Sequence, residues 1–220
     1  MNAFFITGTD TDCGKTYVTC QLLDYFKKHN QKALALKPVA SGCVMKDGVL
    51  QSEDVLRLQH HNGNFPYPIN AFKFAPPISP HLAAKEAHCT IKANDLAVFC
   101  KGNSFSGHDI LLIEGAGGLM APLNAEETWL DFLALTQIPA ILVVGMRLGC
   151  LNHALLTDFA LKTAKIPCLG WIANCLDKDM QALDANIDTL CAKMNSPLLG
   201  KIAYQGALSE TSVLQKIAAF

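Results

Sequence analysis

The 220-residue sequence carries little charge and few aromatic residues. Asp, Glu, Lys and Arg together make up 17% of the chain, aromatic residues make up 8%, and the formal net charge is −1. A chain so close to neutral has no excess of positive charge with which to bind nucleic acid or an anionic membrane. Hydrophobic residues reach 50%, which is enough for a substantial core and excludes disorder over most of the length.

Long hydrophobic runs and a basic leader are also absent. No apolar stretch approaches the ~20 residues that a membrane-spanning helix needs. Residues 1–4 lack the basic region of a signal peptide and lead directly into an apolar run. We therefore expect a cytoplasmic protein with neither a membrane nor a nucleic-acid partner.

The nine cysteines lack the spacing of a disulfide or zinc framework. Their number is odd and no Cys-x-x-Cys pair occurs. Most lie in apolar contexts, as Cys20, Cys168 and Cys191 do, so we predict reduced, largely buried thiols. Cys13 differs because it lies in a glycine-bounded loop before a predicted helix. We interpret it as a space-filling residue whose backbone, not its thiol, would face an anion.

A glycine-bounded loop at residues 8–16 is the most informative stretch in the chain. It reads G-T-D-T-D-C-G-K-T, follows an apolar run at residues 3–6, and precedes a helical pattern at residues 18–26. Strand, loop, Gly-Lys-Thr and helix in this order are typical of a phosphate-binding P-loop. The first glycine lies one residue further back than usual, so the loop is a long variant. The alternative is a tight strand-to-helix turn with an incidental Lys-Thr.

Each part of this loop has a physical task in binding phosphate. Gly14 allows a tight turn that points successive N–H groups inward, and the helix that follows adds the positive end of its dipole. Lys15 has the reach to contact the β- and γ-phosphates, and the Thr16 hydroxyl is a suitable Mg²⁺ ligand.

Apolar strand patterns alternate with helical patterns along the rest of the chain. Residues 62–80 contain five prolines and predict an extended loop. Alternating strands and helices predict βαβ units, and hence one α/β domain over residues 1–220 of the P-loop NTPase type, with a mostly parallel sheet and helices on both faces. Further strands are predicted at residues 32–39, 109–114, 139–145, 168–173 and 198–203, and helices at 52–58, 91–101, 128–135, 151–165, 180–194 and 208–219.

Polar residues follow several of the predicted strands. Lys37 and Ser41 follow the second strand, Glu114 ends the strand at 109–114, and Asn174 follows the strand at 168–173. In an open parallel sheet, ligands bind outside the carboxyl ends of the strands. These residues are therefore predicted to meet the P-loop at one edge.

Three of these groups suggest roles. Glu114, with Thr16 and Asp54, would supply the oxygen ligands that Mg²⁺ prefers, although a solvated carboxylate at a strand exit is the simpler alternative. Lys37 is either a surface lysine or a second ammonium that lowers the repulsion between two anions in a transition state. Asp10 or Asp12 would face a cationic or amine group, because extra negative charge in a phosphate loop weakens triphosphate binding.

Taken together, these motifs resemble those of the dethiobiotin synthetase family of biotin biosynthesis. The long loop variant is the family's own form. The likeness covers almost the whole chain in the family's order. It rests on residues 8–16, 37–42 (K-P-V-A-S-G), 52–54 (S-E-D), 79–81 (S-P-H), 114–118 (E-G-A-G-G), 143–154 (V-V-G-M-R-L-G-C-L-N-H-A), 170–174 (G-W-I-A-N) and 197–200 (P-L-L-G).

The resemblance implies an ATP- and Mg²⁺-dependent ligase that forms C–N bonds by ring closure. The diamine 7,8-diaminononanoate would take up CO₂ as a carbamate, and the carbamate would attack the γ-phosphate of ATP to give a carbamic–phosphoric anhydride. The second amine would then close the ureido ring of dethiobiotin and release phosphate.

The resemblance also implies the site residues. Catalytic roles would fall to Lys37, Lys15 and Thr11, and Mg²⁺ would be held by Thr16, Asp54 and Glu114. Nucleotide contacts would come from Asp12, Cys13, Gly14, Lys15, Thr16, Tyr17, Asp54, Glu114, Gly115, Ala116, Gly117, Asn174, Cys175, Ala203 and Tyr204, with Asn174 reading adenine. The diamine and carbamate would be oriented by Thr11, Lys37, Ser41, Ser79, Gly117, Leu148, Gly149, Cys150 and Asn152.

Members of the family are homodimers in which the neighbouring subunit receives the far carboxylate of the substrate. That role would fall here to residues 148–152, where a helix N-terminus and an amide suit a carboxylate. Two positions depart from the family pattern. Ala203 stands where many members have Pro, and Cys175 stands where they have an acidic residue, which puts purine selectivity in doubt.

Three other readings of a P-loop chain remain. A dimeric switch of the chromosome-partition type would carry an extra lysine early in the loop, and residues 8–13 lack one. An amidotransferase synthetase would need a glutaminase domain, for which the length leaves no room. A non-catalytic nucleotide-binding module has no evident need of Lys37.

Overall fold

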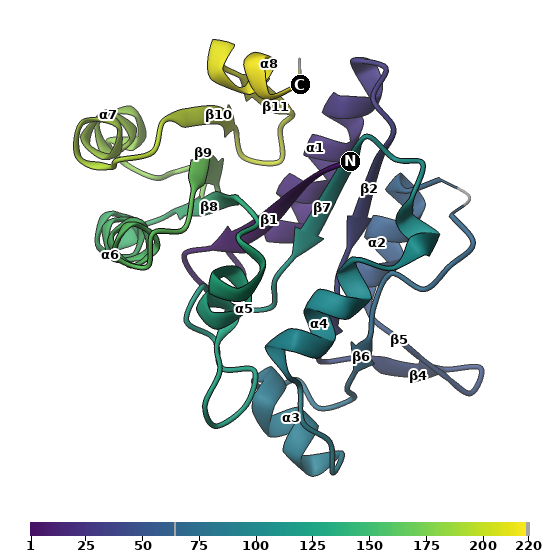
Figure 1. The fold of residues 1–220 in the computed structure, drawn as a ribbon. Coiled ribbons are helices and arrows are strands. Elements are labelled where there is room, and N and C mark those ends of the chain that lie inside the picture. Colours follow the sequence, from purple (N-terminus) through teal and green to yellow (C-terminus); the bar gives the residue numbers. More distant parts are fainter. Residues whose placement is uncertain (64, 219–220) are drawn as a thin grey trace.

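In the computed structural model, which describes residues 1–63 and 65–218, a seven-stranded sheet runs through the middle of the molecule (Figure 1). The strand order is β11-β10-β9-β8-β1-β7-β2, and all neighbours are parallel except the edge pair β10 and β11. The strands are β1 (Asn2–Gly8), β2 (Ala33–Leu36), β7 (Ile110–Glu114), β8 (Ala140–Met146), β9 (Cys168–Cys175), β10 (Leu198–Ile202) and β11 (Leu208–Glu210).

The central strand β1 places the P-loop between the ends of its two neighbours. Ile6 pairs with Glu114 of β7 on one side and with Ile141 of β8 on the other. Every residue of β7 and β8 is buried, as expected for strands covered on both faces. The loop after β1 and the carboxylate that ends β7 therefore lie at the same edge of the sheet.

Helices cover both faces of the sheet, as the alternating pattern predicts. In Figure 1, α4 and α5 lie in front of the central strands and α1 lies behind them. Phe5 of β1 contacts α5, and the strand register places Leu142 of β8 on the same face of the sheet as Phe5. Leu142 packs with residues of α6 and α7, so α5, α6 and α7 cover this face. The helices are α1 (Lys15–Lys28), α2 (Glu53–His61), α3 (Pro80–Glu86), α4 (Ala93–Cys100), α5 (Trp129–Thr136), α6 (Cys150–Thr163), α7 (Leu183–Lys193) and α8 (Ser212–Ala218), with a short 3-10 helix η1 (Asn103–Phe105).

Helix α5 connects the core to the turn that follows β7. Thr128 caps the helix in a capping box with Asp131. Trp129 is almost fully buried, its ring centroid lies 5.2 Å from that of Phe5, and its indole N–H donates to the carbonyl oxygen of Ala116 at 2.9 Å. Packing in the core thereby fixes the backbone of the glycine-rich turn.

The predicted strand at residues 32–39 ends at Leu36 in the structure, and smaller elements follow it. Two short parallel strands, β3 (Val39–Ala40) and β6 (Phe72–Lys73), pair with each other, and β4 (Val44–Lys46) forms a hairpin with β5 (Val49–Gln51). The proline-rich segment 62–80 contains no helix in its described residues before α3 begins at Pro80, although residue 64 lies outside the described part. Helix α3 has no counterpart in the sequence-based expectations.

The predicted helix at residues 208–219 is wrong at its start. Leu208–Glu210 forms β11, antiparallel to β10, and the helix begins only at Ser212. The exposed edge of β10 offers backbone groups that β11 satisfies, and the Leu208 N–H donates to the Gln21 side chain at 3.1 Å. Residue 219, the predicted end, lies outside the described residues.

All nine cysteines are free, and most are buried. Burial raises the pKa of Cys20 and of Cys100 to about 12, so both thiols stay protonated. Cys191, expected in an apolar setting, is exposed, as is Cys89. In the described part of the chain no helix is long and apolar enough to cross a membrane.

The two tryptophans offer a matched test of the link between α5 and the glycine-rich turn. Trp129→Phe is expected to lower the free energy of unfolding by about 2–4 kcal/mol, because it removes buried volume and leaves the buried Ala116 carbonyl without its donor. Trp171→Phe is the control, since the buried indole N–H of Trp171 has no hydrogen-bond partner among the described residues. Urea unfolding measures both, and equal losses would contradict the bracing role.

Candidate functional site

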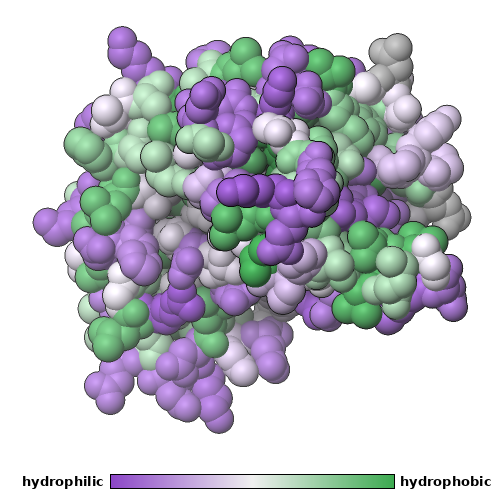
Figure 2. Space-filling model, turned by 90° about the horizontal axis from the view of Figure 1, so that it is seen from below, coloured by the Kyte–Doolittle hydropathy of each residue, from purple (hydrophilic) through white to green (hydrophobic). Residues whose placement is uncertain are grey.

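The carboxyl ends of the central strands form the face on which the polar groups gather. The arrowheads of β1 and β7 point toward the bottom of Figure 1, and Figure 2 views the molecule from that side. Hydrophilic side chains lie across the middle of this face, with hydrophobic patches around them (Figure 2). The P-loop, Lys37 and Glu114 all come to this edge, as the strand-end pattern predicts.

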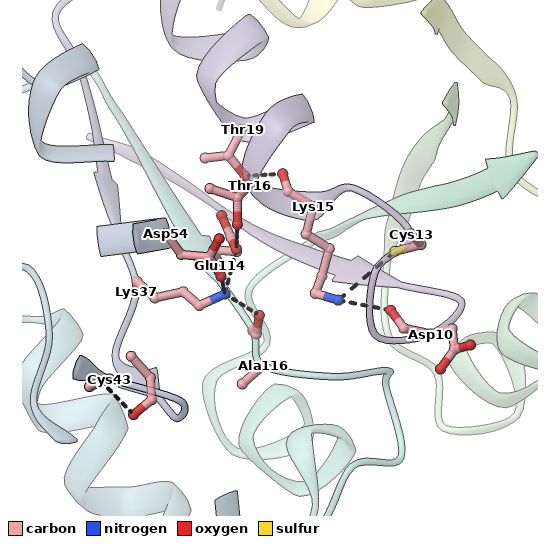
Figure 3. Close-up of polar contacts among 12 residues, drawn as sticks. Asp10, Cys13, Lys15, Thr16, Thr19, Lys37, Cys43, Asp54, Glu114 and Ala116 are labelled. Carbon is pink, nitrogen blue, oxygen red and sulfur yellow. Dashed lines mark hydrogen bonds and ion pairs between the residues drawn. The ribbon is translucent and has the colours of Figure 1, made fainter. Parts of the chain in front are cut away.

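The P-loop wraps from β1 into α1 through two left-handed residues, Asp12 at φ 55° and Gly14 at φ 88°. Helix α1 starts at Lys15, and no side chain of the described residues caps its N-terminus. The Lys15 ammonium folds back to donate to the Asp10 carbonyl oxygen at 2.8 Å (Figure 3). Uncapped N–H groups and a lysine at a helix start make this loop suited to bind phosphate.

Asn174, at the end of β9, supports the P-loop from the sheet side. Its side-chain N–H donates to the Cys13 carbonyl oxygen at 2.9 Å, and the residue is only 4% exposed. A Cβ on Gly14 would lie 2.1 Å from the Asn174 amide nitrogen, so only glycine fits there. The adenine contact expected of Asn174 stays a prediction, and the structure adds a bracing role.

Lys37, Glu114 and Thr16 are buried and form one cluster with the half-exposed Asp54 beside the P-loop (Figure 3). The Lys37 ammonium lies 2.5 Å from Glu114 Oε1 and 3.2 Å from Asp54 Oδ2. The Thr16 hydroxyl donates to the same Glu114 Oε1 at 2.6 Å. Thr16 of α1 and Lys37 thus meet at one oxygen of Glu114, and Asp54 of α2 joins them through the Lys37 ammonium.

Burial and charge act in opposite directions on this cluster. Burial alone would lower the pKa of Lys37, but Glu114 and Asp54 outweigh it and the pKa is raised. Burial alone would raise the pKa of Asp54, but Lys37 outweighs it and the pKa is lowered. The stabilisation from these two shifts is complete between about pH 4 and about pH 10.4, and it is lost as the pH falls through the pKa of Asp54 or rises through that of Lys37.

The second carboxylate oxygen of Glu114 is free to bind a further group. Glu114 is fully buried, and its Oε2 has no hydrogen-bond partner among the described residues. A hydroxyl and two carboxylates are hard oxygen donors of the kind that Mg²⁺ takes together with nucleotide oxygens and water. The residues present therefore fit Mg²⁺. Within residues 1–63 and 65–218 no group of three or more His, Cys, Asp or Glu side chains is placed to hold a metal.

The glycine-rich turn after β7 packs tightly over the P-loop. A Cβ on Gly115 would meet the Phe5 ring at 2.8 Å, and Gly117 adopts φ 73° with the Thr11 hydroxyl 3.9 Å from its would-be Cβ. Gly118 likewise approaches the backbone of Gly8. The expected nucleotide and substrate contacts of Gly115, Ala116, Gly117 and Thr11 thus lie on one side of the loop.

The predicted base-binding residues lie near the start of α1. The Tyr17 hydroxyl donates to the Gly206 carbonyl oxygen at 2.7 Å, which ties α1 to the loop that contains Ala203 and Tyr204. Tyr204 is 44% exposed, whereas Cys175 is buried and its thiol contacts the Asp177 carbonyl oxygen. The contacts that Cys175, Ala203 and Tyr204 are expected to make with the nucleotide base stay predictions.

The residues expected to hold the substrate lie on loops and at helix starts. Ser41 follows β3, and its neighbour Gly42 bonds to the Pro76 carbonyl oxygen, which keeps this loop beside the segment that leads to Ser79 at the start of α3. Leu148 is fully exposed, and Gly149 and Asn152 are exposed, whereas Cys150 is buried. No described contact links residues 148–152 to Lys37 or Glu114.

The sequence analysis did not assign a role to Arg147. Its guanidinium donates to Asp10 Oδ2 at 2.6 Å and so joins the end of β8 to the P-loop. Asp10 thus pairs with an arginine of the protein itself, and the expectation that Asp10 or Asp12 faces a cationic or amine group of a substrate stays a prediction. The one signal in the sequence is a charged residue directly after a fully apolar strand.

Comparisons with known proteins agree with this geometry. A family model described as an AAA domain matches residues 2–212. The chain is 51% identical to "ATP-dependent dethiobiotin synthetase BioD" of Legionella pneumophila (strain Paris), over 96% of this chain and 97% of that protein. It is 43% identical to the protein of the same name from Pseudoalteromonas translucida (strain TAC 125), over 93% of this chain and 91% of that protein.

Solved structures with low sequence identity share the fold. The septum site-determining protein MinD of Pyrococcus horikoshii OT3, solved with Mg-ADP, matches with a TM-score of 0.54 at 20% identity. The match covers 92% of this chain and 81% of the MinD chain. The cell division protein FtsY of Thermotoga maritima matches with a TM-score of 0.53 at 14% identity, over 96% of this chain and 65% of the FtsY chain.

The parallel sheet and the Gly-Lys-Thr loop at the start of α1 define a P-loop NTPase-like, nucleotide-binding protein. Within that class, the curated relatives settle the family: the chain belongs to the ATP-dependent dethiobiotin synthetases.

The buried ion pair yields a test on stability. Lys37→Met is expected to lower the free energy of unfolding by about 3–5 kcal/mol at pH 7, because Glu114 is left as a buried carboxylate without its ammonium. The double variant Lys37→Met/Glu114→Gln removes both charges and should recover most of the loss. Denaturant unfolding of the three proteins measures this, and a single variant as stable as the wild type would contradict the buried pair.

Proposed function

We propose that the protein closes the ureido ring of dethiobiotin from 7,8-diaminononanoate and CO₂ at the expense of ATP. The observation that carries the proposal is the cluster of Lys37, Glu114, Asp54 and Thr16 directly beside the P-loop lysine. Two ammonium groups and a set of oxygen ligands at one sheet edge suit a reaction that joins two anions.

The first steps convert an amine into an activated carbamic–phosphoric anhydride. One amine nitrogen of the diamine attacks CO₂ and loses a proton, which gives a carbamate. A carbamate oxygen then attacks the γ-phosphorus of ATP, and the bond to the bridging oxygen breaks to release ADP. The product is the carbamic–phosphoric anhydride. Lys15 would hold the phosphates, and Lys37 would reduce the repulsion between the carbamate and the γ-phosphate.

The last step closes the ring. The second amine attacks the carbonyl carbon of the anhydride and the C–O bond to phosphate breaks. The attacking nitrogen loses a proton, the leaving inorganic phosphate takes one up, and the cyclic urea remains. Thr11, Ser41 and Gly117 would orient the diamine for this attack. Ordering both amines in one site removes much of the entropic cost of ring closure.

Magnesium is expected to accompany the nucleotide. Thr16, Asp54 and Glu114 would hold the ion, whose charge neutralises the phosphate oxygens during transfer. The buried, unpartnered Oε2 of Glu114 supports this assignment.

The Lys37 ammonium has two possible sets of partners, the carboxylates of the protein and the anionic groups of the ligands. In the free protein its ammonium lies between Glu114 and Asp54, which are the carboxylates assigned to the ion. Two cations on the same oxygens repel each other. We therefore expect the ammonium to leave the carboxylates for the γ-phosphate and carbamate when the nucleotide binds with its ion.

A homodimer in which residues 148–152 receive the partner's substrate carboxylate is part of the proposal. Leu148 is fully exposed, and Leu156 and Phe159 on the outer face of α6 are 58% and 65% exposed. Apolar side chains at this spacing form a stripe that a second copy of the chain would cover.

The main competitor is a P-loop switch that hydrolyses ATP without a second substrate, because one fold can serve both functions. ATP turnover measured with and without diamine and bicarbonate separates the two. Turnover that requires both supports the synthetase, and phosphate release that ignores the diamine contradicts it.

Lys37→Ala tests the assigned role of the second lysine. The variant is expected to lower diamine-dependent turnover about 10²-fold or more, because one preorganised charge in the transition state is lost. Nucleotide affinity, measured by calorimetry on folded variant, should stay nearly unchanged. Equal losses of binding and turnover would mean that Lys37 acts through structure alone.

Divalent-ion binding without nucleotide tests the two-partner role of Lys37. Lys37→Met is expected to bind Mn²⁺ about tenfold more tightly than the wild type, because the competing ammonium is gone from the carboxylates. Electron paramagnetic resonance of free Mn²⁺ measures the affinity. Lys15→Met is the matched control, since that ammonium contacts the Asp10 carbonyl oxygen rather than a carboxylate. An equal gain in Mn²⁺ affinity in both variants would contradict a specific competition between the Lys37 ammonium and the metal ion for the carboxylates.

A further inference from the structure

Asp10 is the meeting point of three polar contacts in the P-loop. One carboxylate oxygen accepts the Arg147 guanidinium at 2.6 Å, and the other accepts the Thr11 N–H at 2.7 Å. Its main-chain carbonyl oxygen accepts the Lys15 ammonium at 2.8 Å (Figure 3). Asp10 therefore connects a residue expected to touch the substrate with the lysine expected to touch the phosphates.

Apart from the glycine-rich turn, which approaches Asp10 and Thr11, few groups hold this part of the loop. Thr11 and Asp12 are exposed and Asp10 is half-buried, so apolar packing contributes little to their conformation. Asp12 also adopts the left-handed conformation, at φ 55°, which a side chain other than glycine resists. The shape of the loop at Asp10 and Thr11 thus depends on polar contacts, and the Arg147 pair reaches it from another strand.

Arg147 is well placed to supply that contact. It follows β8 directly, and its own carbonyl oxygen accepts the Cys150 N–H at 3.0 Å in the turn that starts α6. Its guanidinium therefore extends from a backbone that is anchored at both ends. The side chain is 43% exposed, so the pair contributes little to global stability.

The charge of Asp10 is the reason that such a contact is needed. A carboxylate in a loop that binds a triphosphate and a carbamate repels both ligands, and the repulsion acts over short distances in a partly dry site. Arg147 offsets that charge without using a substrate group. Arginine suits the task because it stays protonated at any relevant pH and holds a carboxylate in a defined geometry.

We propose that Arg147 is a positioning residue that neutralises Asp10 and thereby sets Thr11 for the diamine and Asp10 for Lys15. This inference rests on the proposed function. A positioning role differs from a stabilising role in one respect. If Arg147 is lost, kcat/KM for the diamine falls because the Asp10 charge is unpaired, so removing that charge should restore kcat/KM.

The test is a pair of variants and their combination. Arg147→Met is expected to lower kcat/KM for the diamine about tenfold or more, with nucleotide affinity changed less than about threefold, because the uncompensated carboxylate lies beside Thr11. Arg147→Met/Asp10→Asn should recover most of the loss, since an asparagine oxygen still accepts the Thr11 N–H. Arg147→Lys should recover part of it, because it restores charge without the forked geometry.

Two controls separate the possible outcomes. Lys201→Met breaks an exposed ion pair with Asp184 that lies outside the site, and it should leave kcat/KM unchanged. Diamine-dependent ATP turnover by the wild type is measured first, and its absence would overturn the proposed function itself. With that turnover present, an Arg147→Met enzyme as active as the wild type, or a double variant no better than Arg147→Met, overturns the role of Arg147 alone.

Discussion

The site depends on one buried interaction, the contact between the Lys37 ammonium and the Glu114 carboxylate at 2.5 Å. An ion pair without access to water is costly unless each charge has good partners, and here Thr16 and Asp54 provide additional ones. A pair that contributes little to net stability suggests a functional reason for its presence. The carboxylates suit a metal ion and the ammonium suits a phosphate, and we propose that each charge holds the other until a nucleotide arrives.

The scaffold explains how these groups come together. Parallel strands end at one edge, so β1, β2, β7, β8 and β9 deliver their following residues to the same place. Trp129 then fixes the turn after β7 through the Ala116 carbonyl, and Asn174 fixes the P-loop through the Cys13 carbonyl. A frame of this kind fixes the backbone of the turn and of the P-loop.

The order of strands and helices and the strand-end residues follow from local patterns, which is why Glu114 and Lys37 could be predicted as neighbours of the P-loop. Contacts set by loop conformation could not. The Arg147–Asp10 pair joins residues 137 apart in sequence, and nothing in the spacing of either residue specifies it. The edge strand at Leu208–Glu210 was missed for a related reason, since its conformation is decided by the unpaired edge of β10 rather than by its own periodicity.

The resting position of Lys37 could likewise not be predicted, because it reflects competition among three charged groups of which Lys37 and Glu114 are buried and Asp54 is half-exposed. The most direct measurement of the central claim is a crystal structure with Mg²⁺, a non-hydrolysable ATP analogue and the diamine. Lys37 Nζ is expected within hydrogen-bonding distance of a γ-phosphate oxygen and away from Glu114. An ammonium that remains between Glu114 and Asp54 in that complex would contradict the exchange of partners on which the account depends.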